Sequence, residues 1–103
     1  MEKIANVAEM KRGESIDFVY QGAQAVLVRT KGGRFAAYST ACPHEGGNIV
    51  WRPEINKLVC ECHLSLFNVE DGSVYMLSSL IKHIDALTPI GLEIDENKNA
   101  YAR

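Results

Sequence analysis

The chain has 103 residues, of which 47% are hydrophobic and 23% charged, and these values are typical of one globular domain with a single core. The formal net charge is −2 and no cluster of lysine or arginine occurs, which argues against a nucleic-acid-binding protein. Charged side chains are scattered through residues 1–18, so we expect no signal peptide, no membrane-spanning segment and a cytoplasmic protein. Three cysteines cannot form a complete set of disulfides, and beside histidines they are more typical of metal ligands.

The apolar residues occur in short runs bounded by turn residues, a pattern that predicts strands. In chain order we expect strands at Ile4–Val7, Ser15–Tyr20, Ala25–Thr30, Arg34–Tyr38, Lys57–Cys60, Phe67–Val69, Ser73–Met76, Leu87–Ile94 and Ala100–Ala102. In the second of these, Ile16, Phe18 and Tyr20 occupy every second position and should share one face. Only Met76–Ala86 is compatible with a helical turn. The sequence therefore predicts one all-β domain over residues 1–103, an antiparallel sandwich or barrel.

Two short runs carry cysteine and histidine together. They are Cys42-Pro43-His44 and Cys60-Glu61-Cys62-His63, and 15 residues separate them. Each run follows a predicted strand, so two loop tips can close over one centre. A mixed set of thiolates and imidazoles suits either tetrahedral zinc or an iron–sulfur cluster.

The spacing within each run favours the iron–sulfur alternative. Zinc sites usually pair cysteine with cysteine and histidine with histidine, whereas each loop here supplies one of each kind. A zinc site built on Cys42, His44, His63 and either Cys60 or Cys62 stays open as an alternative. Buried apolar thiols would explain a single cysteine, but not four residues in this joint spacing.

With Phe67 and Asp71-Gly72 downstream, the two runs resemble the Rieske-type ferredoxin family, and the resemblance extends through Leu87 to the last strands. It implies a Rieske-type antiparallel β-sandwich whose cluster-binding subdomain has two ligand loops, and one [2Fe–2S] cluster per chain. By the same resemblance, Cys42 and Cys60 bind one iron, and His44 and His63 bind the other. Neutral imidazoles replace two thiolate charges, which raises the reduction potential. The family's histidines also reach the surface, where an electron partner docks.

Five positions bear on the potential that the resemblance implies. Ser65 occupies the place of a serine that, in high-potential relatives, donates a hydrogen bond to a bridging sulfide, whereas Phe67 stands where those relatives have a tyrosine. Gly47 lies where the disulfide partner of Cys62 would be, so that disulfide cannot form. Negative charge beside the ligands, from Glu45 and Glu61, also disfavours reduction. We therefore expect a potential in the lower half of the Rieske range of about −150 to +300 mV.

The remaining expectations concern one segment and three single residues outside the ligand set. Relatives place a Gly-Pro segment over the cluster, but this chain has Ser78-Ser79-Leu80 there. We expect Trp51 to pack under the first ligand loop, with an exposed docking role as the alternative. Cys62 is expected to be a small loop residue and His83 a surface histidine.

The family resemblance implies an electron-transfer protein and not an enzyme. We expect a monomeric carrier that passes single electrons from a flavin-type reductase to a terminal enzyme such as a Rieske-type oxygenase. The alternatives are a small subunit of a larger oxidoreductase, as in assimilatory nitrite reductases, and a zinc-stabilised interaction module.

Overall fold

The computed structural model describes residues 2–40, 48–61, 64–77 and 85–103. Within these ranges the chain forms strands and no helix, as the sequence predicts. The strands are β1 Glu2–Asn6, β2 Ser15–Tyr20, β3 Ala23–Arg29, β4 Phe35–Ser39, β5 Ile49–Arg52, β6 Lys57–Cys60, β7 Leu66–Asn68, β8 Val74–Met76, β9 Leu92–Ile94 and β10 Asn99–Ala102. Across the same residues, nothing helical is long and apolar enough to cross a membrane.

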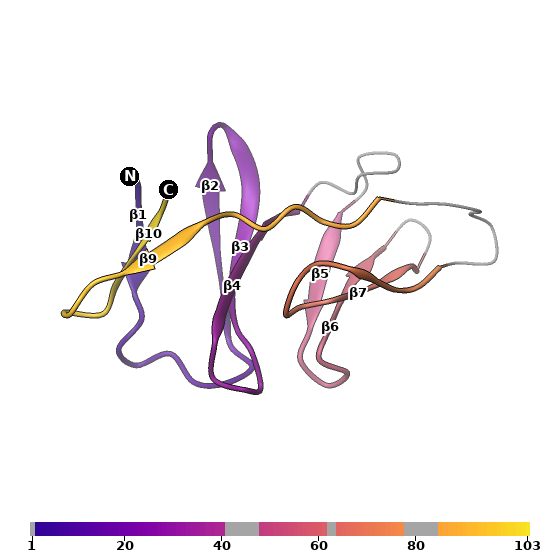
Figure 1. The fold of residues 1–103 in the computed structure, drawn as a ribbon, viewed down its shortest axis with the longest axis horizontal. Helices are drawn as coiled ribbons and strands as arrows, with labels where there is room; N and C mark the ends of the chain where they lie inside the picture. Colours follow the sequence, from indigo (N-terminus) through magenta and orange to yellow (C-terminus); the bar gives the residue numbers. More distant parts are fainter. Residues whose placement is uncertain (1, 41–47, 62–63, 78–84) are drawn as a thin grey trace.

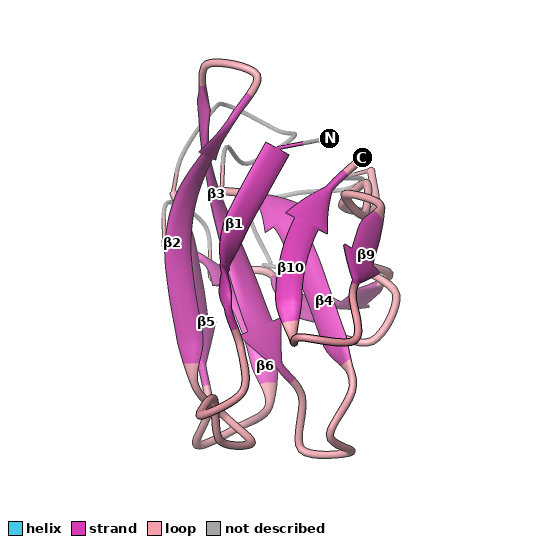
Figure 2. Cartoon of the chain, turned by 90° about the vertical axis from the view of Figure 1, so that its left-hand side faces the viewer, coloured by secondary structure: helices cyan, strands magenta, loops and turns pink. Residues whose placement is uncertain are grey.

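The strands form three antiparallel sheets, with the strand orders β1-β10-β9, β2-β3-β4 and β5-β6-β7-β8. The sheets follow one another along the long axis of the molecule, with β2-β3-β4 in the middle (Figure 1). Glu2 pairs with Ala102, so the two ends of the chain lie side by side on the first sheet. Figure 2 shows this sheet from the side of the termini.

The central strand of the middle sheet, β3, is buried on both faces. Residues 25–28 of β3 are all at most 3% exposed, which explains why this run is continuously apolar instead of alternating. On the side of β1-β10-β9, Ile16, Phe18 and Tyr20 of β2 pack on one apolar cluster, as their alternation predicts. On the other side, Val26, Val28 and Tyr38 pack with the sheet β5-β6-β7-β8 in a second cluster.

Residues 85–91 lead from the last sheet back to the first and run across the middle sheet (Figure 1). Leu87 N–H donates to the carbonyl of Gly72 at 2.8 Å, and Ile90 N–H donates to the carbonyl of Ala37 at 2.8 Å. The prediction of one strand over Leu87–Ile94 is therefore wrong in its first part. The backbone there bonds to two different sheets in turn, and only the last three residues join a ladder as β9.

One strand is absent from the sequence prediction, and one predicted turn is described only in part. The strand β5 was not predicted, although it pairs with β6 along its whole length. The helical turn expected within Met76–Ala86 is not found at residues 76, 77, 85 and 86, since Met76 ends a strand and the other three have no regular structure. Residues 78–84, including Ser78-Ser79-Leu80 and His83, lie outside the described residues.

Candidate metal centre

The second ligand loop is closed at its base by the backbone of Cys60, the last residue of β6. Cys60 N–H donates to the carbonyl of Ser65 at 2.9 Å, and Leu64 N–H donates to the carbonyl of Cys60 at 2.7 Å. Leu64 has φ +58°, a left-handed conformation that non-glycine residues rarely adopt and that tightens the turn. The side chain of Cys60 is fully buried. Its position is therefore fixed by the sheet and the turn together.

The first ligand loop starts and ends beside the second. Ile49 N–H donates to the carbonyl of Thr40 at 2.7 Å, so the residues that flank 41–47 are joined to each other. Glu61 N–H donates to the carbonyl of Asn48 at 3.0 Å, and Ile49 pairs with Cys60 in the ladder. The bases of both loops thus lie at the same end of the sheet β5-β6-β7-β8.

Six of the residues singled out in and beside the two ligand loops lie outside the described residues. They are Cys42, His44, Cys62 and His63, together with Glu45 and Gly47 of the first loop. Of the expected ligands, the structure therefore describes Cys60 alone. The two thiolates and two imidazoles of the set are the donors that a [2Fe–2S] cluster with unlike irons requires, and the joined loop bases suit one shared centre.

The side chains around Cys60 form a water-excluding wall. Ser65 and Phe67 are each 0% exposed, and Phe67 belongs to the same apolar cluster as Cys60 and Leu58. Ser65 therefore lies within the loop that Cys60 opens and is screened from water. Phe67 has no hydroxyl that could donate a hydrogen bond from this buried position. Glu61, the residue after Cys60, is exposed.

Trp51 is partly buried against the protein, with a contact that the sequence did not reveal, while its expected place under the first ligand loop concerns residues 41–47, outside the described ranges. Its side chain lies against the apolar cluster that contains Cys60, and its indole Nε1–H donates to the carbonyl of Gly13 at 2.8 Å. Trp51 thereby links the edge strand β5 to the turn that precedes β2.

Exposed apolar side chains lie next to the second ligand loop. Leu64, which directly follows His63, is 70% exposed, and Tyr75 and Met76 of β8 are 57% and 56% exposed. Leu66 pairs with Met76, which brings β8 beside the end of this loop. Sequence reasoning missed this surface because an apolar residue in a short strand reads equally well as core.

Tyr38 joins the middle sheet to the sheet that carries the ligand loops. Its hydroxyl donates to the carbonyl of Val69 at 2.7 Å. Burial raises the pKa of Tyr38 to about 12, and the negative charges of Asp71 and Glu70 act in the same direction. Asp71 itself has a lowered pKa, because the side chain and backbone of Ser73 donate hydrogen bonds to its carboxylate.

Residues 1–82 match the family model described as "Rieske [2Fe-2S] domain". Among solved structures, the chain is similar to the plasma membrane Rieske protein PetC3 from Synechocystis PCC 6803, with 20% identity, a TM-score of 0.81 and coverage of 100% of this chain and 99% of that chain. It is also similar to the ferredoxin of carbazole 1,9a-dioxygenase from Nocardioides aromaticivorans IC177, with 19% identity, a TM-score of 0.73 and coverage of 97% and 93%.

A third similar structure is the quaternary ammonium Rieske monooxygenase CntA, with 20% identity and a TM-score of 0.81. Here the match covers 99% of this chain but only 30% of CntA, so the chain corresponds to less than a third of that protein. Comparison with curated protein sequences gives no match. At these identities the structural likenesses establish the fold.

Proposed function

Because the chain belongs to the Rieske [2Fe–2S] domain family, we propose that it is a one-electron carrier whose cluster is held by Cys42, His44, Cys60 and His63. Membership confirms the resemblance, the all-β fold and the [2Fe–2S] cofactor, one per domain, that the sequence predicts. A Rieske domain is an electron-transfer unit and not a catalytic one. The assignment of the four ligands is the proposal.

The observation that supports this ligand set most is the joining of the two loop bases. The hydrogen bonds Ile49–Thr40 and Glu61–Asn48 hold the bases of both loops together at one end of the sheet β5-β6-β7-β8. The proposed cluster supplies reversible one-electron chemistry, with Cys42 and Cys60 on one iron and the two histidines on the other. The chain's own part is to bury Cys60, exclude water with Phe67 and offer the exposed apolar side chains beside the second loop as a contact surface.

For the partners, we propose a flavin-type reductase as electron donor and a terminal oxygenase as acceptor, with the carrier acting as a cytoplasmic monomer. The support is the near-complete mutual coverage with a ferredoxin that belongs to a dioxygenase system. As a carrier, the purified protein is expected to be monomeric and to speed electron flow from a reductase to a soluble acceptor.

A second candidate is a Rieske unit that works inside a larger oxidoreductase, either as a small subunit of the nitrite reductase type or as part of a longer chain. The specific support is the match to CntA, in which this fold makes up 30% of a larger oxygenase chain. A subunit of this kind is expected to co-purify with a large partner, which a shuttling carrier does not do.

The test of the proposed function is a visible absorption spectrum of freshly purified protein, with iron, sulfide and zinc assayed on the same sample. A red-brown protein with about two irons and two sulfides per chain, bleached by dithionite, is the expected result. Replacement of His44 or His63 by alanine should abolish this spectrum, whereas His83→Ala should leave it unchanged. A colourless protein with one zinc would contradict the proposal and leave a zinc-stabilised module.

A further inference from the structure

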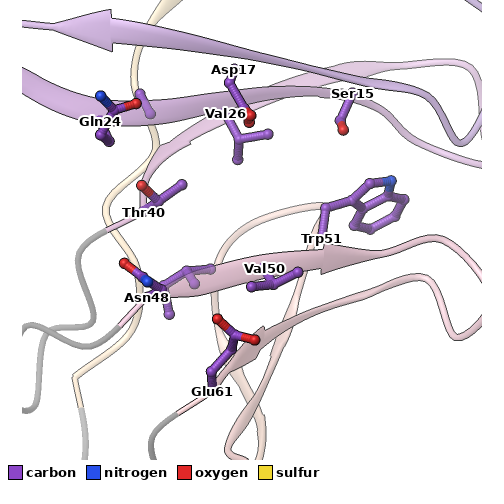
Figure 3. A pocket seen from close by; sticks show the side chains of 11 residues that line it. Ser15, Asp17, Gln24, Val26, Thr40, Asn48, Val50, Trp51 and Glu61 are labelled. Carbon is purple, nitrogen blue, oxygen red and sulfur yellow. The ribbon is translucent and has the colours of Figure 1, made fainter.

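A cavity of about 400 Å³ opens between the strands β2 and β3 on one side and the edge strand β5 on the other (Figure 3). Apolar side chains contribute part of its wall, namely Ala25, Val26, Ile49, Val50 and Trp51. Polar side chains contribute the rest, and among them Asp17 and Glu61 carry charge. This volume lies within the range of pockets that bind small molecules or side chains, about 300–1,000 Å³.

The charge of this cavity has one sign. No lysine, arginine or histidine is among its described lining residues. Asp17 projects from β2 and Glu61 follows the end of β6, and in Figure 3 both carboxylates point toward β5, from opposite sides. In the part of the chain that the structure describes, neither carboxylate has an ion-pair or hydrogen-bond partner. The cavity therefore carries two exposed carboxylates, one on each side of β5, that no described lining residue neutralises.

This combination matches the chemistry of a basic side chain. Arginine and lysine carry an alkyl stem that packs on apolar surface and a charged head that stays at the polar rim. A guanidinium head also donates several hydrogen bonds to carboxylates, which a compact inorganic cation does not do. The apolar wall of Val26 and Val50 suits the stem, and the negative charge that Asp17 and Glu61 place on either side of β5 attracts the head.

We propose that this cavity is a socket for an arginine or lysine side chain of the protein that exchanges electrons with the cluster. The proposal rests on the electron-carrier function given above. A protein partner is favoured over a small metabolite because Glu61 directly follows Cys60, so an occupant of the socket sits beside the proposed centre. Attraction between the negative charge of the cavity and the positive charge of the partner's side chain also speeds the encounter of carrier and partner.

The test uses the oxidised holoprotein labelled with ¹⁵N and titrated with N-acetyl-arginine amide, followed by NMR. Trp51 is the only tryptophan, so its indole N–H gives one side-chain signal from the cavity wall itself. We expect saturable shifts of this signal and of the amides near Asp17 and Asn48. Asp17→Asn and Glu61→Gln should each raise the dissociation constant roughly two- to fivefold.

Matched controls separate the socket from general charge effects. Glu93→Gln removes an exposed carboxylate from β9, in the sheet farthest from the cavity, and should leave the dissociation constant unchanged. N-acetyl-citrulline amide, which keeps the stem but lacks the charge, should not bind. Guanidinium, which keeps the charge but lacks the stem, should bind more weakly than the arginine probe.

Three outcomes would overturn the socket: equal binding by the citrulline probe, no weakening in Asp17→Asn and Glu61→Gln, or tighter binding of choline than of the arginine probe. The last result would assign the cavity to a small organic cation. Iron and sulfide contents of the same samples keep the two proposals distinguishable. Failure of the probe with an intact cluster overturns the socket alone, whereas absence of the cluster overturns the carrier.

Discussion

A single hydroxyl, that of Ser65, is expected to tune the proposed cluster. Ser65 is fully buried inside the loop that Cys60 opens. A hydrogen bond donated to a sulfide stabilises the reduced, more negative cluster, so its loss lowers the potential. Ser65→Ala should lower the midpoint potential by roughly 40–60 mV, which corresponds to about 1 kcal/mol for one electron. Ser73→Ala removes a hydroxyl that hydrogen-bonds Asp71 instead and should leave the midpoint unchanged. An equal midpoint in Ser65→Ala and the parent would show that this hydroxyl does not act on the cluster.

The residue scale also sets the expected potential of the parent protein. Phe67 is buried in the same apolar cluster as Cys60 and has no hydroxyl to donate, while Glu61 adds negative charge beside a proposed ligand. We therefore expect a midpoint in the lower half of the range of about −150 to +300 mV, and Phe67→Tyr should raise it. A redox titration followed by visible absorption measures both. A parent midpoint above about +100 mV would contradict the expectation.

At the scale of elements, the sequence predicts strands well where local signals and tertiary partners agree. The bounds of β2 and β6 are predicted to the residue. In both strands the residues that the sequence pattern selects are the ones that pair with a neighbouring strand, β3 for β2 and β5 for β6, over the whole length of the strand. β5 was missed because Ile49–Arg52 is short and directly follows a glycine-rich loop. The segment 87–91 reads as strand, yet its backbone bonds to two sheets in turn, which only the packing of the sheets decides.

The same limit applies to the site. The spacing of cysteine and histidine identifies the metal-binding family, because ligand chemistry depends on a few residues close in sequence. The cavity beside Glu61 could not be predicted, because its walls come from β2, β3 and β5, whose approach depends on how two sheets pack. The contact of Trp51 with Gly13 joins residues far apart in the chain and was missed for the same reason.

One glycine fixes the place where residues 85–91 leave the last sheet. Gly72 has φ +79°, and a Cβ there would lie 2.5 Å from the carbonyl oxygen of Leu87 and 2.9 Å from the ring of Tyr38. Gly22 has φ +81° but nothing within 4 Å of such a Cβ. Gly22→Ala should therefore cost only backbone strain, about 1 kcal/mol, whereas Gly72→Ala should lower the free energy of unfolding by more than about 3 kcal/mol. Urea unfolding of the two variants measures the difference, and equal losses would contradict the crowding at Gly72.

At the scale of the whole molecule, Tyr38 couples the middle sheet to the sheet of the ligand loops, and this coupling is sensitive to alkaline pH. The pKa of Tyr38 is raised from 10.0 to about 12 in the folded protein, so the folded state holds this proton more tightly than the unfolded chain. The stabilisation is therefore complete below about pH 10 and is lost as the pH rises toward about 12. Ionisation would also remove the hydrogen bond to Val69.

Urea unfolding at about pH 9 and about pH 11.5 tests this coupling, with about 2 kcal/mol of stability expected to depend on Tyr38 between the two. Tyr38→Phe should lose that share of the pH dependence, and at about pH 9 it should be less stable by about 1 kcal/mol because the carbonyl of Val69 loses its donor. Tyr75→Phe is the matched control, since Tyr75 is 57% exposed and should keep the parent's pH dependence. If Tyr38→Phe kept the parent's pH dependence, the loss of stability at alkaline pH would not come from the Tyr38 proton. The contact between the two sheets would then depend on the apolar cluster alone.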